Sequence, residues 1–120
     1  MIHIIEVNDI QIYAYHGCLP EEGKIGGKYS VTIHVSTDFS LASQTDDLSE
    51  TIDYVLISQI AKDEMVIRSK LIEHVGQRIV ERLKKEVRGL ISLHVKIIKH
   101  SPPIHGNVAN VAIIIEESLV

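Results

Sequence analysis

Hydrophobic and polar residues alternate along four segments of the chain, and this period of two is typical of strands that cover a core on one side. The clearest segment is YSVTIHVST, residues 29–37. Similar segments cover residues 3–15, 92–100 and 108–117. A glycine-rich connection joins the first two, and SPPIHGN joins the last two, where proline cannot continue a strand ladder. We therefore predict four strands, of which the first two form an antiparallel pair.

Apolar residues recur at helical spacing between the second and third of these strands. One such run extends from about Tyr54 to Val66. A longer apolar stripe follows, and it comprises Leu71, Ile72, Val75, Ile79, Val80, Leu83 and Val87. Ser69 is positioned to cap this second helix, and Gly76 on the stripe predicts the close approach of a neighbouring element. The predicted order is ββααββ, in one domain that spans residues 1–120.

The composition is that of an ordinary globular domain. Of 120 residues, 45% are hydrophobic and 23% are charged, and the net charge is -4, so no basic surface is available to bind nucleic acid. No apolar stretch reaches the length that spans a membrane, and no signal-like segment is present. Cys18 is the only cysteine and cannot form an internal disulfide. We therefore expect a cytoplasmic protein that binds neither nucleic acid nor membrane.

Aliphatic residues on both faces of the last two strands predict self-association. Strand parity places Leu93, Val95, Ile97, Val111, Ile113 and Ile115 on one side, and Ile98, Ala112 and Ile114 on the other. Two helices cover only one face of a sheet. We therefore expect another copy of the chain to cover part of the second face.

Lys99 is the most informative candidate for catalysis. Strand parity places it on the same side as Val95 and Ile97, so an apolar face ends in an ammonium group. Partial burial favours the neutral amine, which suits proton transfer near neutral pH. The alternative is a lysine at a strand end whose charge simply reaches solvent.

Two further candidates lie at the starts of the predicted helices. Glu73 could accept paired N–H donors from a flat heterocycle, or it could only complement the helix dipole. Tyr54 could donate a proton or stack on a ring, or it could only pack. Neither residue is decisive alone.

The segment YAYHGCLPEEGKIGG, residues 13–27, interrupts a strand where an ordinary turn is expected. His16 could act as a base or could cap the turn. Glu21 and Glu22 could orient a hydroxylated ligand or a water, or they could be solvated loop residues. The glycines around them make the backbone flexible.

The sequence gives little support for a metal site, an activated nucleophile or a phosphate-binding loop. Histidines on the predicted strands, which are His3, His34 and His94, lack the close grouping of typical zinc sites. No nucleophile elbow, GxGxxG or Walker pattern is present. We therefore expect no catalytic metal and no cofactor.

Four motifs occur in order and are specific as a set, although none is specific alone. They are YAYHGCLPEEGKIGGKYSVTIHV, DDLSETIDY, LIEHVGQRIVERL and VKIIKHSPPIHG. From about Ile4 to Glu116 the chain resembles the dihydroneopterin aldolase family of folate biosynthesis. The resemblance implies a tunnelling fold of the α+β class, with two helices on one face of a four-stranded antiparallel sheet. It also implies that four copies close a barrel, that two rings stack into an octamer, and that active sites lie between subunits.

The implied activity is that of a carbon–carbon lyase. It would cleave 7,8-dihydroneopterin by a retro-aldol reaction to 6-hydroxymethyl-7,8-dihydropterin and glycolaldehyde, without metal or Schiff base. Lys99 would transfer protons with an ordered water, Tyr54 of the adjoining subunit would assist protonation, and Glu22 would hold the substrate side chain or that water. Glu73 would anchor the pterin. Backbone groups would complete this recognition at Thr51, Ile52 and Ile72.

The chain departs from the family pattern at a few positions, and two alternative functions remain. Gly27 stands where the family usually has glutamine, and His100 and His105 lie in a turn where the family varies. The alternatives are an epimerase that acts at C2′ of dihydroneopterin or its triphosphate, and a non-catalytic pterin-binding module. The presence of Tyr54 and Lys99 argues against an oxygenase relative, and the lack of clustered histidines argues against a zinc-dependent relative.

Overall fold

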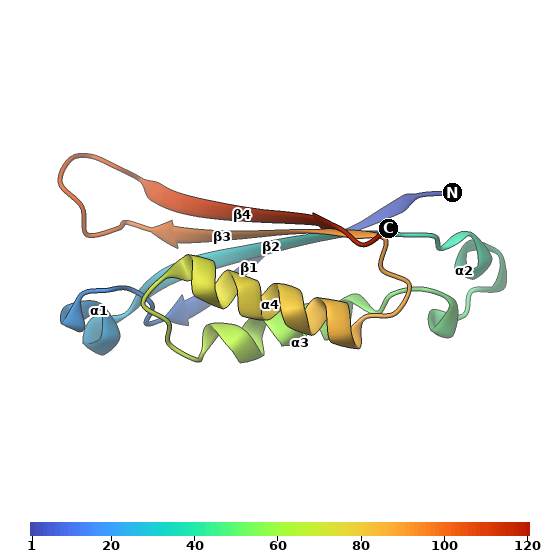
Figure 1. The fold of residues 1–120 in the computed structure, drawn as a ribbon, viewed down its shortest axis with the longest axis horizontal. Helices are drawn as coiled ribbons and strands as arrows, with labels where there is room; N and C mark the ends of the chain where they lie inside the picture. Colours follow the sequence, from blue (N-terminus) through green and yellow to red (C-terminus); the bar gives the residue numbers. More distant parts are fainter.

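The computed structural model describes all 120 residues, which form an antiparallel sheet with two long helices packed against one face (Figure 1). The strands lie side by side in chain order: β1 (His3–Ala14), β2 (Gly27–Thr37), β3 (Ser92–His100) and β4 (Asn110–Ser118). The long helices are α3 (Tyr54–Met65) and α4 (Ile72–Glu86). The α+β class and the order ββααββ of the main elements are therefore confirmed. No helix is both long enough and apolar enough to cross a membrane.

The hydrophobic pattern does not predict three short helical segments. They are α1 (Pro20–Ile25), α2 (Ser40–Thr45) and the 3₁₀ turn η1 (Leu48–Glu50). Segments this short contain too few apolar positions to show a helical period. In α1, however, proline and two glutamates occupy the first turn, where these residue types favour a helix start. The connection between β1 and β2 is therefore partly helical, and not only a flexible glycine-rich turn.

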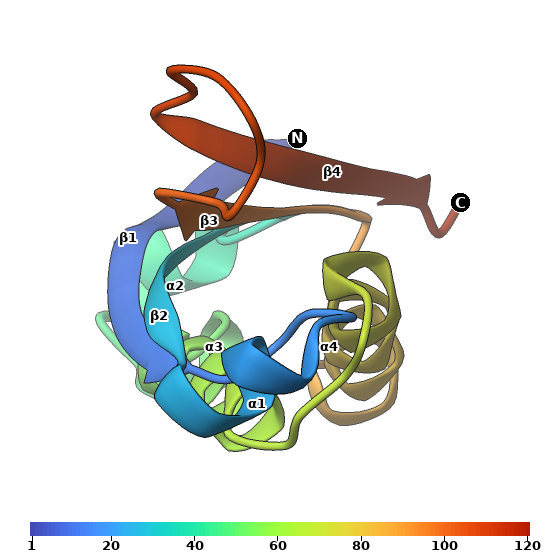
Figure 2. The same cartoon turned by 90° about the vertical axis from the view of Figure 1, so that its left-hand side faces the viewer.

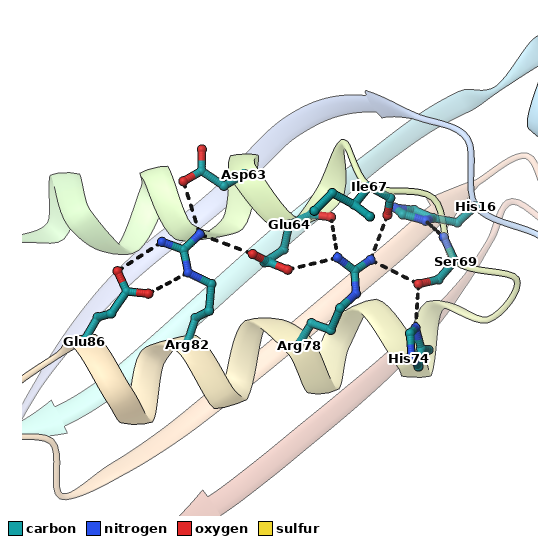
Figure 3. Close-up of polar contacts among 9 residues, drawn as sticks. All are labelled: His16, Asp63, Glu64, Ile67, Ser69, His74, Arg78, Arg82 and Glu86. Atoms are coloured by element: carbon teal, nitrogen blue, oxygen red, sulfur yellow. Dashed lines mark hydrogen bonds and ion pairs between the residues drawn. The ribbon is translucent and has the colours of Figure 1, made fainter.

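The prediction that Ser69 caps the second long helix is wrong. The N-cap residue of α4 is Leu71, whose backbone is extended and whose side chain makes no cap hydrogen bond. The hydroxyl of Ser69 instead pairs with Nδ1 of His74 at 2.7 Å and accepts a hydrogen bond from Arg78 at 3.0 Å (Figure 3). The helix begins later than the serine because the extended backbone at Leu71 separates them.

The sheet curves over α3 and α4, and the hydrophobic core lies between them (Figure 2). Its fully buried members include Val31, Ile33, Ile57, Ile60, Val75, Ile79, Val95 and Ile97. Gly76 of α4 faces β4, and a Cβ added there would lie 3.0 Å from Cδ1 of Ile115 and 3.1 Å from Cδ1 of Ile113. The glycine therefore permits the close approach that its place on the apolar stripe predicted.

No helix covers the other face of the sheet (Figure 1). Ile114 on this face is 54% exposed, and strand parity places Ile98 and Ala112 beside it.

A row of polar residues also crosses the four strands in register, and it consists of Glu6, His34, His94 and Glu116. The rings of the two histidines stack with their centroids 4.9 Å apart. No group of three or more His, Cys, Asp or Glu side chains is arranged to hold a metal ion.

Candidate active site

Lys99 lies at the C-terminal end of β3, opposite Tyr29 of β2, and its side chain is on the helix side of the sheet as predicted. Only 17% of the side chain is exposed. The ammonium group donates a hydrogen bond to the carbonyl of His16 at 3.0 Å and forms an ion pair with Oε2 of Glu22. The fold thus brings together two predicted site residues that are 77 positions apart in the sequence.

Helix α1 positions the carboxylate of Glu22. The side chain is only 14% exposed, and its Oε1 accepts a hydrogen bond from the backbone N–H of Leu19 at 3.1 Å. Burial alone would raise the pKa of Glu22. The hydrogen bonds from Lys99 and Leu19, together with the positive charges of Lys99 and Arg68, outweigh burial and lower that pKa. Glu22 is therefore a carboxylate at neutral pH and remains paired with Lys99.

The loop before α1 is anchored to the segment between α3 and α4. The guanidinium of Arg68 donates hydrogen bonds to the carbonyls of Tyr15 at 2.9 Å and Gly17 at 2.8 Å. The backbone N–H of Ser69 donates to Nδ1 of His16 at 2.9 Å, and the carbonyl of Ser69 accepts from the N–H of Gly17 at 3.0 Å. Both anchors fix the backbone that contacts Lys99.

The sequence analysis did not single out Tyr29 or Arg68. Tyr29 is 2% exposed and lies under the ammonium group of Lys99, which is 5.8 Å from the ring centroid. The alternation of Tyr29 with Val31 would have placed it on the helix side, so a usable signal existed. Arg68 lies outside the periodic elements, and no local pattern marks it.

A pocket of about 200 Å³ opens beside the pair of Lys99 and Glu22. Other residues of its wall include Leu19, Glu21, Ile25, Gly27, Ser101 and Pro103. No atom lies within 4 Å of a Cβ added at Gly27, so the absence of a side chain there leaves room at the wall. The pocket combines an ammonium group and a carboxylate with apolar side chains, and it can hold a small polar ligand beside a proton donor and acceptor.

No hydrogen bond or ion pair joins the other predicted site residues to this pair. The first turn of α4 carries Ile72, which is buried, and Glu73, which is exposed. The start of α3 lies at the end of the helix layer away from α1 (Figure 1), and the predicted residues there are Thr51, Ile52 and Tyr54. Tyr54 is 64% exposed. Within one chain the start of α3 therefore lies apart from the pocket beside Lys99 and Glu22 (Figure 1).

Comparison with known proteins decides the family. The family model "Dihydroneopterin aldolase" matches residues 5–116. Dihydroneopterin aldolase of Bacillus subtilis (strain 168) is 36% identical over 110 residues, which are 91% of this chain and 92% of the relative. That of Staphylococcus epidermidis is 36% identical over 117 residues, 94% of each chain. The chain belongs to the dihydroneopterin aldolase family. The fold agrees, since the structure of E. coli dihydroneopterin aldolase in complex with neopterin superposes with a TM-score of 0.88, at 22% identity, over 97% of this chain and 99% of that one.

Residues 5–116, which match the dihydroneopterin aldolase family, include Gly17, and the structure leaves no room for a side chain at this position. Gly17 has φ of 143°, and a Cβ added there would lie 2.2 Å from the carboxyl carbon of Glu22. We expect Gly17→Ala to lower the free energy of unfolding by about 2 kcal/mol or more, because backbone strain adds to the displacement of Glu22. Urea unfolding measures this loss.

Gly27→Ala is the matched control for Gly17→Ala. Nothing lies within 4 Å of the Cβ that this substitution adds. We expect the free energy of unfolding to change by no more than about 0.5 kcal/mol. Equal losses for the two variants would show that the Glu22 carboxylate imposes no special requirement on Gly17.

Proposed function

We propose that the protein cleaves 7,8-dihydroneopterin by a metal-free retro-aldol reaction. The products would be 6-hydroxymethyl-7,8-dihydropterin and glycolaldehyde. The observation that carries the proposal is the ion pair of Lys99 and Glu22 at the wall of a small pocket. Family membership supports the same activity.

The reaction needs little beyond orientation and proton transfer. Because one side-chain carbon stays on the ring as the hydroxymethyl group, the bond that breaks joins the first and second side-chain carbons. A base removes the proton from the hydroxyl of the second carbon, which becomes the aldehyde of glycolaldehyde. The electron pair of the broken bond enters the dihydropterin ring, which acts as the electron sink. A proton then returns to the first carbon.

Lys99 and Glu22 would carry the proton transfers. We propose that Lys99, in the molecules in which its side chain is the neutral amine, takes the hydroxyl proton through an ordered water, and that the ammonium group formed in this way returns a proton at carbon. Glu22 would orient the substrate side chain or that water, since its carboxylate is ionised and faces the pocket. Tyr54 of a neighbouring subunit would stack near the pterin and assist protonation.

Glu73 would anchor the amino-pyrimidine edge of the pterin. A carboxylate accepts paired N–H donors in a fixed geometry, and Glu73 is exposed in the first turn of α4. Backbone groups would complete pterin recognition at Thr51, Ile52 and Ile72. We expect Glu73→Gln to lower the affinity for the pterin by a larger factor than it lowers kcat.

We further propose a homo-oligomer in which four subunits close a barrel and two such rings form an octamer. The strands β1 and β4 are the two edges of the sheet and have no partner on their outer sides. Edge pairing between copies would close the barrel and would bring the start of α3 of one copy to the Lys99 pocket of another. The single cysteine supports a cytoplasmic location.

Incubation of the purified protein with 7,8-dihydroneopterin in the presence of EDTA tests the proposed activity. We expect chromatography to detect 6-hydroxymethyl-7,8-dihydropterin and glycolaldehyde in equal amounts. A C2′ epimer without cleavage would make the protein an epimerase. Binding without any change in the substrate would leave only a pterin-binding module.

A further inference from the structure

We propose that His16 and Tyr29 are positioning residues that hold the ammonium group of Lys99 at the pocket, through the peptide group between His16 and Gly17. The inference rests on the proposed catalytic role of Lys99. It assigns a purpose to two buried side chains, neither of which has a place in the proton transfers described above. His16 is 0% exposed and Tyr29 is 2% exposed.

The peptide group between His16 and Gly17 connects two parts of the site. Its carbonyl accepts hydrogen bonds from Nζ of Lys99 at 3.0 Å and from the hydroxyl of Tyr29 at 2.7 Å. Its N–H donates to the carbonyl of Ser69 at 3.0 Å. A peptide group is planar, so anchoring its N–H also sets the direction of its carbonyl. Lys99 is thereby oriented by the segment between α3 and α4.

The imidazole of His16 adds a second anchor on the same residue. Its Nδ1 accepts the backbone N–H of Ser69 at 2.9 Å, so this nitrogen carries no proton. With this contact and the hydrogen bond of the Gly17 N–H, the loop is bound to both the backbone N–H and the backbone carbonyl of Ser69. Rotation of the His16 carbonyl away from Lys99 would break the hydrogen bond of the Gly17 N–H in the same peptide group, and the imidazole bond holds the adjoining backbone of His16 in place on Ser69.

Tyr29 limits the positions that the ammonium group of Lys99 can take, through both its hydroxyl and its ring. Its hydroxyl takes one of the two acceptor positions of the His16 carbonyl, which leaves one for the ammonium group. Its ring lies 5.8 Å from Nζ of Lys99 and meets the His16 ring edge-on at 5.3 Å. The ammonium group is thus confined between a carbonyl, an aromatic face and the carboxylate of Glu22.

The docked loop requires a neutral His16. Burial lowers the pKa of His16 from its ordinary value of 6.5, and the positive charges of Arg78 and Lys99 act in the same direction. Backbone groups of Met65 and Ser69 raise this pKa, but only in part, and Nε2 of His16 has no well-formed hydrogen bond. The stabilisation of the docked loop is therefore complete above pH 6.5 and is lost as the pH falls through the lowered pKa. Protonation would place two donors, Nδ1–H and the Ser69 N–H, against each other.

Two conservative substitutions separate positioning from simple packing. Tyr29→Phe removes only the hydroxyl, and we expect kcat to fall about 5- to 10-fold with KM unchanged, because the His16 carbonyl is no longer held.

His16→Asn keeps an acceptor oxygen near the place of Nδ1, so we expect kcat at pH 7 to stay within about twofold of the original. His16→Leu, which removes the acceptor, should lose activity, and His94→Asn on the uncovered sheet face serves as the control.

The pH profile gives a readout that packing alone would not change. As the pH falls below 6.5 and through the lowered pKa of His16, the unmodified protein should lose kcat because His16 protonates, and His16→Asn should lose this part of the profile because asparagine does not titrate. The amide of Gly17 should also exchange faster with deuterium in Tyr29→Phe than in the unmodified protein. A normal kcat in Tyr29→Phe, or an unchanged acid limb in His16→Asn, would overturn the inference.

The same experiments distinguish failure of this inference from failure of the proposed function. If the unmodified protein turns over and Lys99→Ala does not, while Tyr29→Phe is normal, only the positioning role is wrong. If the unmodified protein does not turn over, the proposed function fails. The exchange rate of the Gly17 amide then still decides whether the Tyr29 hydroxyl holds this peptide group.

Discussion

Replacing Lys99 with alanine is expected to lower kcat for 7,8-dihydroneopterin by about 10²- to 10⁴-fold, the range for loss of a group that transfers protons. The affinity for the pterin should change little, because Glu73 and backbone groups are proposed to bind its ring. Single-turnover kinetics and calorimetric titration with the substrate measure the two quantities separately. A variant that keeps its full turnover would remove Lys99 from the mechanism.

Two further variants make the Lys99→Ala result specific. Lys96→Ala removes a lysine from the same strand on the face without helices, and it should retain full activity. Glu73→Gln should show the opposite pattern to Lys99→Ala, with weaker binding and a smaller change in kcat. Because Glu22 loses its partner in Lys99→Ala, a thermal unfolding curve must accompany the kinetics, since an unpaired buried carboxylate is destabilising.

Mixing two inactive variants is expected to restore activity if the site lies between subunits. Lys99→Ala keeps Tyr54, and Tyr54→Ala keeps Lys99, so a heterologous interface between them can contain both intact side chains. In a random equal mixture about a quarter of the interfaces would be intact, and the mixture should recover about a quarter of the original activity. Two observations motivate the expectation: Tyr54 is 64% exposed, and the start of α3, where it lies, is at the end of the helix layer away from α1 (Figure 1).

The complementation experiment needs the subunits to exchange. The variants are therefore denatured together, refolded together and compared with each variant refolded alone. Refolding of the unmodified protein shows how much activity the procedure returns. If the mixture stays as inactive as its components while the unmodified protein recovers, each site is contained within one chain.

The main elements could be predicted because their hydrophobic patterns are local. In strand β2, Val31 and Ile33 alternate with polar residues because successive side chains point to opposite faces. Helix α4 shows its period over 15 residues, which is long enough to be distinct from chance. Helix α1 has six residues, and its start depends on Pro20 rather than on a period. The capping prediction for Ser69 was wrong because backbone conformation at Leu71, which no local pattern reveals, sets the start of α4.

The site was predicted as a set of residues, but its contacts were not. Strand parity placed Lys99 on the helix side, and the family resemblance placed Glu22 in the same site, where it would hold the substrate side chain or a water. Their ion pair depends on the pairing of β2 with β3 and on the docking of the loop before α1 by Arg68. These contacts join residues more than 50 positions apart, so no window of sequence contains them.

The sequence by itself determined the strands, the two long helices and the side of the sheet on which Lys99 lies, because burial repeats with the period of each element. Only the tertiary structure decided that the carbonyl of His16 receives both Lys99 and Tyr29, and that Gly17 makes room for the carboxylate of Glu22. It also decided that the start of α3, of which Tyr54 is the first residue, lies at the end of the helix layer away from α1 (Figure 1). The physical reason is that distances across the fold depend on strand register and loop docking, which are set by contacts between segments remote in the sequence.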